Sequence, residues 1–353
     1  MKMHASRRSG LVSILLLFVA SAFAADHKHD TLIVTSTNDA SGNSVVVFKL
    51  NPATSTLTLV NTLPTGGNGG ASGNAGAVQF EDFTGAVVNY GSNSISRLFR
   101  EGDAISVAGN VDLASKCAQP VSVALKDFHA FVVGSNCAES RSWPQGNLEG
   151  SVVSLTDSSA AQIVVGQSWA AVTLKSGSVL QLPLSTSGVL AGSSSSVTLP
   201  GDANNTPLGA AFWGDILGFN PAHSPDSFAL VDAEGNVLPI LGPQPAYPTN
   251  APCWLAKGPG NIWYSGNSPG QAISIFFTDG RGGKFYKSIS LPGTPTDVTV
   301  SRDKKWLAII YTASDGSGAR VSVFSIDHYG DLTLAATSTP IGVSSFGGVA
   351  ISQ

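Results

Sequence analysis

The chain has 353 residues, of which 42% are hydrophobic and 12% are charged, and its formal net charge is −4. This length allows one large all-β domain or two ordinary domains, and the apolar content is enough for a real core. The sparse, mildly negative charge provides no basic stripe, so nucleic-acid binding is excluded from the expected functions.

The first 24 residues read as a signal peptide. Lys2, Arg7 and Arg8 form a positive segment, residues 11–23 are apolar, and residues 22–24 (Ala-Phe-Ala) form a cleavage site. No later segment approaches about 18 consecutive apolar residues, so no membrane span is expected. The pattern predicts a mature protein that is secreted to the extracellular space or the periplasm, with a short tail over residues 25–30.

Cleavage after residue 24 would place His27 third in the mature chain. A free amine, two backbone nitrogens and a third-position imidazole can surround Cu(II) or Ni(II) in a square plane. The alternative is a disordered tail without a ligand, which we favour. We therefore predict no metal and no cofactor, and keep His27 as a weak candidate.

The strands begin at residue 31, and the first unit of the chain recurs near its end. Residues 31–51 align without gaps on residues 307–327. The matched positions are Ile33/Ile309, Asp39/Asp315, Ser41/Ser317, Gly42/Gly318, Val45/Val321, Val47/Val323 and Phe48/Phe324. So many matches in register indicate an internal repeat of short strands separated by turns.

Strands that open a repeat unit recur about every 40 to 50 residues, the spacing of four-stranded propeller blades. Candidates lie near Ala77, Val121, Trp169, Gly209, Cys253, Thr296 and Gly348. The N-terminal unit lacks its first strand, and residues 347–353 resemble that strand. The sequence therefore predicts one all-β domain over residues 31–353, a seven-bladed propeller closed by the C-terminal strand. Six or eight blades remain alternatives, because residues 160–245 are ambiguous.

The chain has three cysteines, so at most one intramolecular disulfide can form. Cys117 and Cys137 fall in two loops on the same face of one blade. A disulfide between them is expected, and two unpaired thiols are the alternative. Asn204 begins a glycosylation sequon, which is informative only in a eukaryote.

The candidate ligand-binding residues lie on loops of the face that usually binds ligands. Residues 136–150 are interpreted as a long loop whose Glu139, Arg141 and Trp143 form the rim of a pocket, or alternatively a solvated surface loop. The ends of three strands add aromatic side chains around the mouth of the ring. These are Tyr90, Tyr264 and Tyr311.

His223 is the further catalytic candidate. A carboxylate, Asp226, lies close to it in the sequence, and histidine beside a carboxylate suits acid–base chemistry. The alternative is an exposed histidine in a proline-rich loop, which is the more common case.

Three segments resemble a known family: residues 44–60, 320–336 and 298–311. They are similar to the strand and turn motifs of the seven-bladed lactonase-type propellers, which include 6-phosphogluconolactonase-like and 3-carboxymuconate-cyclising enzymes. The resemblance implies a propeller, and enzymes of the family place histidine at the start of inner strands with arginine and glutamate near the channel. Here those strands open with Ala77, Val121, Thr296 and Gly348. Because no histidine opens these strands, we expect the catalysis of the family to be lost or altered in this protein.

Two functions follow as hypotheses, and whether the protein is an enzyme stays open. The first is a monomeric, secreted propeller that binds a small or sugar-like ligand, or an extracellular protein partner. The alternative is an enzyme acting on a lactone or muconate, similar to a lactonase or cycloisomerase. It would use His223 or Glu139 as acid or base, and Arg141 to hold a carboxylate.

Overall fold

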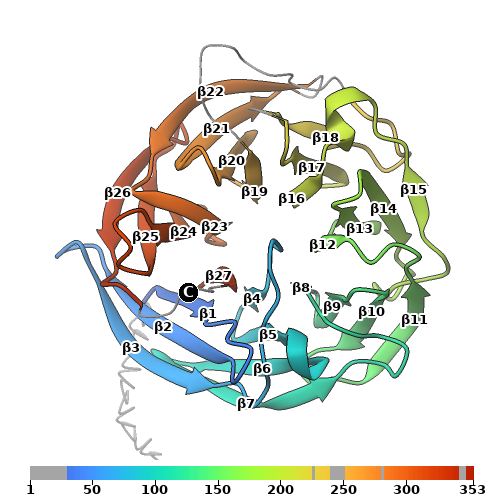
Figure 1. Ribbon diagram of the computed structural model, residues 1–353, viewed down its shortest axis with the longest axis horizontal. Helices are drawn as coiled ribbons and strands as arrows, with labels where there is room; N and C mark the ends of the chain where they lie inside the picture. The colour runs from blue at the N-terminus through green and yellow to red at the C-terminus, as the bar shows by residue number, and fades with distance from the viewer. Residues whose placement is uncertain (1–29, 225–226, 239–250, 280–281, 342–346) are drawn as a thin grey trace, which may run out of the picture.

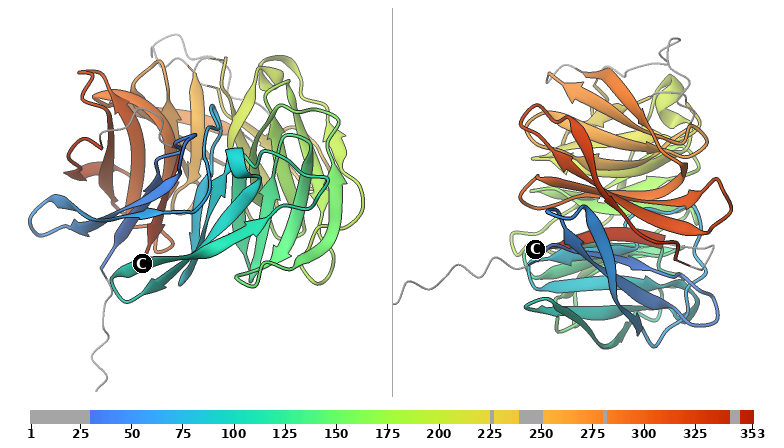
Figure 2. Two further views of the ribbon diagram at one scale, coloured as in Figure 1. Left: turned by 60° about the horizontal axis from the view of Figure 1, so that its bottom comes forward. Right: turned by 90° about the vertical axis from the view of Figure 1, so that its left-hand side faces the viewer.

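A computed structural model describes residues 30–224, 227–238, 251–279, 282–341 and 347–353. In this part of the chain the regular structure is β strand, apart from two short 3-10 turns, η1 (Tyr90–Ser92) and η2 (Gly201–Asn204). The strands form seven sheets arranged around a central axis in a flat disc (Figures 1 and 2). Within the described residues, no helix has the length and apolarity needed to cross a membrane.

Each sheet is a blade whose first strand lies nearest the axis (Figure 1). The innermost strands, for blades 1 to 7, are β4 (Val78–Glu81), β8 (Ser122–Lys126), β12 (Ala160–Val165), β16 (Pro207–Trp213), β19 (Pro252–Lys257), β23 (Gly293–Val300) and β27 (Gly347–Ser352). The second strands, in the same order, are β5 (Thr84–Asn89), β9 (His129–Val133), β13 (Trp169–Leu174), β17 (Ile216–Pro221), β20 (Ile262–Asn267), β24 (Trp306–Ala313) and β1 (Leu32–Ser36).

The outer half of each blade is more exposed. The third strands are β6 (Ser94–Glu101), β10 (Cys137–Ser142), β14 (Ser178–Pro183), β18 (Ala229–Val231), β21 (Ala272–Thr278), β25 (Ala319–Ile326) and β2 (Ser44–Asn51). The fourth strands are β7 (Ala104–Asp112), β11 (Leu148–Ser154), β15 (Ser195–Val197), β22 (Gly283–Ser290), β26 (Leu332–Thr337) and β3 (Thr56–Pro64). In blade 4 the described residues form three strands, and a single bridge joins Val231 to Val237.

Burial explains why the strands of a blade differ in composition. Second strands are covered on both faces by neighbouring blades, so they read as continuous apolar runs. In β24, residues 307–311 are fully buried. The outer strand β3 exposes most of its side chains, and it carries threonine and asparagine accordingly. The repeat in the sequence follows this decrease in burial from the inner strands to the outer strands.

The predicted seven-bladed ring is confirmed, and so is its closure by the C-terminal strand. One predicted strand is wrong in its position. Trp169 opens β13, the second strand of blade 3, whereas the first strand is β12. Both segments are short apolar runs, and a spacing of about 40 to 50 residues accommodates either one.

The ring closes where β27 pairs antiparallel with β1, with Ser352 opposite Leu32 and Ala350 opposite Val34. Side chains strengthen the seam, since the Thr35 hydroxyl donates to the carbonyl of Gly348 at 2.6 Å. The two strands therefore belong to one blade although they come from opposite ends of the chain.

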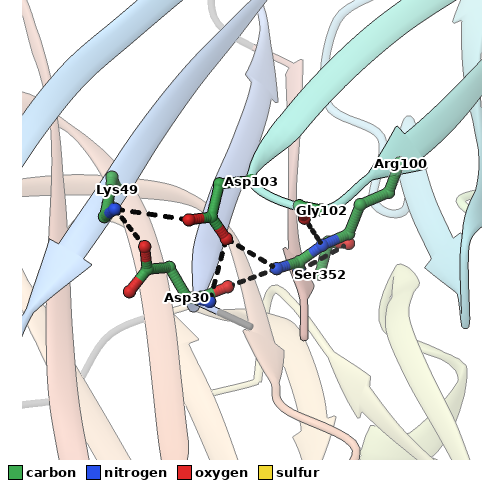
Figure 3. Close-up of polar contacts among 6 residues, drawn as sticks. All are labelled: Asp30, Lys49, Arg100, Gly102, Asp103 and Ser352. Atoms are coloured by element: carbon green, nitrogen blue, oxygen red, sulfur yellow. Dashed lines mark hydrogen bonds and ion pairs between the residues drawn. The ribbon is translucent and has the colours of Figure 1, made fainter. Parts of the chain in front are cut away.

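A buried arginine holds this seam to blade 1 (Figure 3). Arg100, at the end of β6, is 3% exposed. Its guanidinium donates to the carbonyl of Gly102, the hydroxyl of Ser352 and the carbonyl of Asp30. Asp103 lies 3.8 Å away, and Lys49 forms ion pairs with Asp30 and Asp103. Ser352 is buried with it, whereas Asp30 and Gly102 lie nearer the surface, and through these bonds Arg100 connects both ends of the chain to the neighbouring blade.

We expect Arg100→Met to lower the free energy of unfolding by about 2–3 kcal/mol, because it removes the buried donor of the Ser352 hydroxyl and of the carbonyls of Asp30 and Gly102, while the methionine fills the same space. Urea denaturation followed by tryptophan fluorescence measures this loss. The matched control is Arg302→Met, which removes an exposed ion pair with Asp82 and should cost less than about 1 kcal/mol. Equal losses of unfolding free energy in the two variants would contradict the role of Arg100 in holding the seam to blade 1.

Candidate functional site: the central channel and its plug

The loop from blade 7 to blade 1, residues 66–77, crosses the central channel and is called here the plug loop. Figure 1 shows the segment before β4 reaching into the middle of the ring. The Ala75 amide donates to the carbonyl of Ala161 in blade 3 at 3.3 Å, and the Gly76 carbonyl accepts from Val123 in blade 2 at 2.9 Å. The loop is thus bonded to blades 2 and 3, beyond the two blades that it connects.

The end of the plug loop requires glycine. Gly76 has φ +68°, and a Cβ there would lie 3.0 Å from the hydroxyl of Ser122. That hydroxyl donates to the Gly76 carbonyl and accepts from the Ile163 amide. A side chain at this position would combine backbone strain with a close contact, so glycine is needed for the loop to descend into the channel.

The start of the loop is held by Asn38, from the turn between β1 and β2. Its side-chain oxygen accepts from the amides of Gly70 and Ala71, and its side-chain nitrogen donates to the Ala71 carbonyl. On the opposite side, the ammonium group of Lys175 lies 3.2 Å from the side-chain oxygen of Asn74 and 3.4 Å from the carbonyl of Gly73. These bonds fix the loop in one conformation across the channel.

Asp297, on the inner strand β23, anchors the deepest part of the plug. One carboxylate oxygen accepts from the amide of Gly76 at 3.1 Å and from the amide of Val349 at 3.3 Å, and the other accepts from Val298. Burial raises the pKa of this carboxyl to about 7, although the three amide donors act in the opposite direction.

The plug loop divides the channel into two cavities. The upper cavity, of about 260 Å³, lies at the N-terminal ends of the inner strands, and its lining contains no charged side chain among the described residues. Its lining is Asn38, Ala71, Ser72, Gly73, Asn74, Ala77, Val121, Trp254, Thr296 and Gly347. The lower cavity, of about 230 Å³, lies at the other ends of those strands and includes Asp297 and the two lysines Lys257 and Lys304.

The expected loop over residues 136–150 is wrong: it consists of β10, a turn and β11. Glu139 and Arg141 lie in β10 with exposures of 0% and 6%, and their side chains are 2.5 Å apart. Glu139 also accepts from the Ala114 amide, and Arg141 donates to the Gly146 carbonyl. A polar segment can be a buried strand when its charges are paired in this way, so neither residue lines the upper or the lower cavity.

The aromatic candidates are placed differently from the expectation as well. Trp143 is 2% exposed and packs in the core of blades 1 and 2, in the turn after β10. Tyr264 and Tyr311 are fully buried, and the Tyr264 hydroxyl donates to the Gly330 carbonyl. Burial raises the pKa of Tyr264. Only Tyr90, in η1, keeps a partly exposed ring, and it too lies outside both cavity linings.

The remaining candidates lie apart from one another. His223 is exposed in the turn after β17, where its Nδ1 lies 2.9 Å from the Thr206 hydroxyl, and it lines neither cavity. Asn204 is exposed at the end of η2. His27 and Asp226 fall outside the described residues. The predicted disulfide between Cys117 and Cys137 is confirmed, with a Cα separation of 5.3 Å.

From the sequence, residues 66–76 are expected as a loop on the ligand-binding face, but sequence reasoning missed Asp297 and the entry of this loop into the channel. The signal for the loop is its glycine content, because residues 66–76 include Gly66, Gly67, Gly69, Gly70, Gly73 and Gly76. For Asp297 the signal is a single carboxylate in an inner strand that is otherwise apolar or neutral. Neither signal identifies the partner, because the bonded residues are far apart in the sequence.

Stability should respond to pH through Asp297. Its carboxyl has a raised pKa in the folded protein, so the folded state holds a proton that the unfolded chain releases. The stabilisation that this proton gives the folded state is complete below about pH 4 and is lost as pH rises to about 7. Relative to Asp297→Asn, the wild type should lose on the order of a few kcal/mol of unfolding free energy across that window.

Urea denaturation from pH 4 to 8 measures the difference between the two proteins. The control is Asp315→Asn, which changes an exposed carboxyl whose pKa is lowered by its hydrogen bonds to Ser317. The difference between the wild type and this control should stay flat from pH 5 to 7. If the difference in unfolding free energy between the wild type and Asp297→Asn does not change with pH, the raised pKa of Asp297 is contradicted.

No protein-family model matches the chain, and no curated protein matches it by sequence. Solved structures do share its fold. A functionally unknown protein from Desulfotomaculum acetoxidans is 15% identical, with 92% of this chain and 99% of that chain covered at a TM-score of 0.70. A putative 6-phosphogluconolactonase from Bacteroides uniformis is 13% identical, with 92% of this chain and 99% of that chain covered at a TM-score of 0.67. The periplasmic gluconolactonase of Pseudomonas aeruginosa is 14% identical, with the same coverage of the two chains and a TM-score of 0.65. The chain therefore has the fold of the lactonase-type β-propellers, as the resemblance implied.

Proposed function

We propose that the protein is a secreted propeller that binds a small, neutral, polar ligand such as a monosaccharide in the upper cavity. The observation that carries this proposal is the plug loop, which closes the channel below a cavity whose lining is uncharged. An anionic lactone or muconate would need fixed positive charge in the lining, and the ammonium group of Lys175 beside it is already engaged by Asn74 and the carbonyl of Gly73. An uncharged lining of amide, hydroxyl and aromatic groups suits a neutral ligand instead.

Trp254 supplies the apolar surface of the cavity. Its indole nitrogen donates to the carbonyl of Pro295 at 2.8 Å, which fixes the orientation of the ring. Thr296 and Asn74 add a hydroxyl and an amide close to it. A rigid aromatic ring with a few polar neighbours is the arrangement that orients a small polyol, and a volume of about 260 Å³ restricts the ligand to a small molecule.

Export is part of the proposal. Residues 1–24 have the pattern of a signal peptide, and the disulfide between Cys117 and Cys137 is typical of an oxidising compartment. The similarity in fold to a periplasmic gluconolactonase is consistent with a location outside the cytoplasm.

A second candidate is a lactone-converting enzyme. The fold is shared with structures described as gluconolactonases, and Asp297 offers a carboxyl whose pKa of about 7 suits acid–base chemistry. Against it, Asp297 is 4% exposed and its carboxylate is engaged by three backbone amides, and the residues expected to act together are dispersed. His223 is exposed in blade 4, whereas Glu139 and Arg141 form a buried pair in blade 2.

Differential scanning fluorimetry of residues 25–353 against neutral sugars, lactones and muconates separates the two functions. A ligand at about a hundred times its dissociation constant adds roughly 2.7 kcal/mol and raises the melting temperature. We expect such a rise with a neutral sugar, and expect Ser72→Phe to abolish it by filling the cavity. Ser193→Phe, an exposed position outside the lining, is the control and should keep it.

A different pattern would overturn the binding proposal. If a lactone raises the melting temperature and is turned over, and Asp297→Asn abolishes turnover while Ser72→Phe leaves it intact, the enzyme is the correct function.

A further inference from the structure

The lower cavity is open to the face of the ring opposite the proposed ligand site. It is bounded above by Gly76 and Asp297 and continues into a neighbouring hollow of about 500 Å³. The two spaces share the lining residues Gln79, Leu125, Thr299 and Val300. A small molecule can therefore reach the lower cavity without passing the plug loop.

Two lysines from adjacent blades line this cavity side by side. Lys257 ends β19, and Lys304 lies in the turn before β24. The ammonium group of Lys304 donates to the backbone carbonyl of Lys257 at 3.1 Å, which brings the two residues together. Burial and the charge of Lys304 lower the pKa of Lys257 to about 8, and burial lowers the pKa of Lys304. Lys257 is half-buried and Lys304 is more exposed, and their two positive charges repel each other.

Neither lysine has a counter-ion among the residues that the structure describes. Of the carboxylates that line the two spaces, Asp303 pairs with Lys305, and Asp82 pairs with Arg302. Asp297, in the lower cavity itself, accepts from three backbone amides, and Glu81 accepts from the amide of Asp127. Lys257 and Lys304 take part in none of the ion pairs of the described chain. A pair of like charges in a partly desolvated cavity is costly unless an anion compensates it.

The two lysines differ in how far their hydrogen-bonding capacity is used. The Lys257 ammonium donates to the carbonyls of Gly258, Gly260 and Ile262 and lies over the rings of Trp213 and Trp263, at 5.6 and 5.1 Å. Its charge is thus fixed in place. Lys304 has one protein acceptor for three N–H donors, so it keeps donors for a ligand.

We propose that the lower cavity is a second binding site, which takes a small oxyanion held by the charges of Lys257 and Lys304. The amide groups of Gln79 and Gln162 line the inner part of the same cavity and add neutral donors. The oxyanion is a phosphate or a carboxylate small enough for about 230 Å³. This site is separate from the upper cavity, because the plug loop lies between them.

Isothermal titration calorimetry at low salt tests the site with two probes, inorganic phosphate and acetate. We expect the wild type to bind at least one probe, and Lys304→Gln to weaken that binding at least tenfold. Lys305→Gln is the matched control, since it removes the same charge from the same turn but from a side chain that is paired with Asp303 and lies outside the cavity lining. It should change the affinity less than twofold.

The wild type alone provides a second readout that needs no variant. Because the pKa of Lys257 is about 8, the affinity for the anion should fall as pH rises from 7 to 9, beyond any change caused by phosphate ionisation. Acetate, which is fully ionised throughout this range, removes the contribution of phosphate ionisation, and Asp297→Asn removes that of the Asp297 carboxyl in the same cavity, whose pKa is about 7. Lys304→Arg keeps the charge and should retain binding.

Several outcomes would overturn the proposal: no heat with either probe, equal weakening by Lys304→Gln and Lys305→Gln, or an affinity for acetate that does not change with pH. Binding of phosphate alone identifies a phosphate-bearing ligand, and binding of acetate identifies a carboxylate. A neutral sugar should not compete with the anion, because the two sites are separate. If no anion binds in the lower cavity, the proposal for the upper cavity is unaffected, and if no sugar binds in the upper cavity, the proposal for the lower cavity is unaffected.

Discussion

The carboxylate of Asp297 is the contact on which the centre of this molecule depends. It accepts amide hydrogens from its own strand, from Gly76 of the plug loop and from Val349 of the closing strand. One buried group therefore joins blade 6, the loop that blocks the channel and the strand that completes the ring. Its environment favours the neutral form of the carboxyl, so the same contact makes the middle of the ring sensitive to protonation.

The sequence was a good guide to the fold because each blade is defined by local features. The match between residues 31–51 and 307–327 reflects equivalent pairs of strands, β1–β2 and β24–β25. Blade 3 misled the analysis because β12 and β13 are both short apolar runs. In blade 2, the segment with Glu139 and Arg141 looked like a loop, because the ion pair that allows it to be buried is formed only on folding.

The site was harder to predict because it is built from contacts between distant residues. Gly76 meets Asp297 across 221 positions, and no periodic pattern records such a pair. The result is one channel with two chemically different ends. The upper cavity has an uncharged lining, whereas the lower cavity carries two lysines that have no counter-ion among the described residues. A single ring scaffold can thus present different chemistry on its two faces, although every blade repeats the same architecture.

The seam between β27 and β1 has a consequence for how the chain folds. Six blades are built mostly from neighbouring segments, and such local contacts form quickly. The hydrogen bond from Thr35 to Gly348 instead spans 313 positions, so the entropy of closing that loop must be lost before the contact forms. We therefore expect the meeting of the two ends to be a late step of folding. Before it, blade 7 lacks its inner strand and Asp297 lacks its Val349 donor.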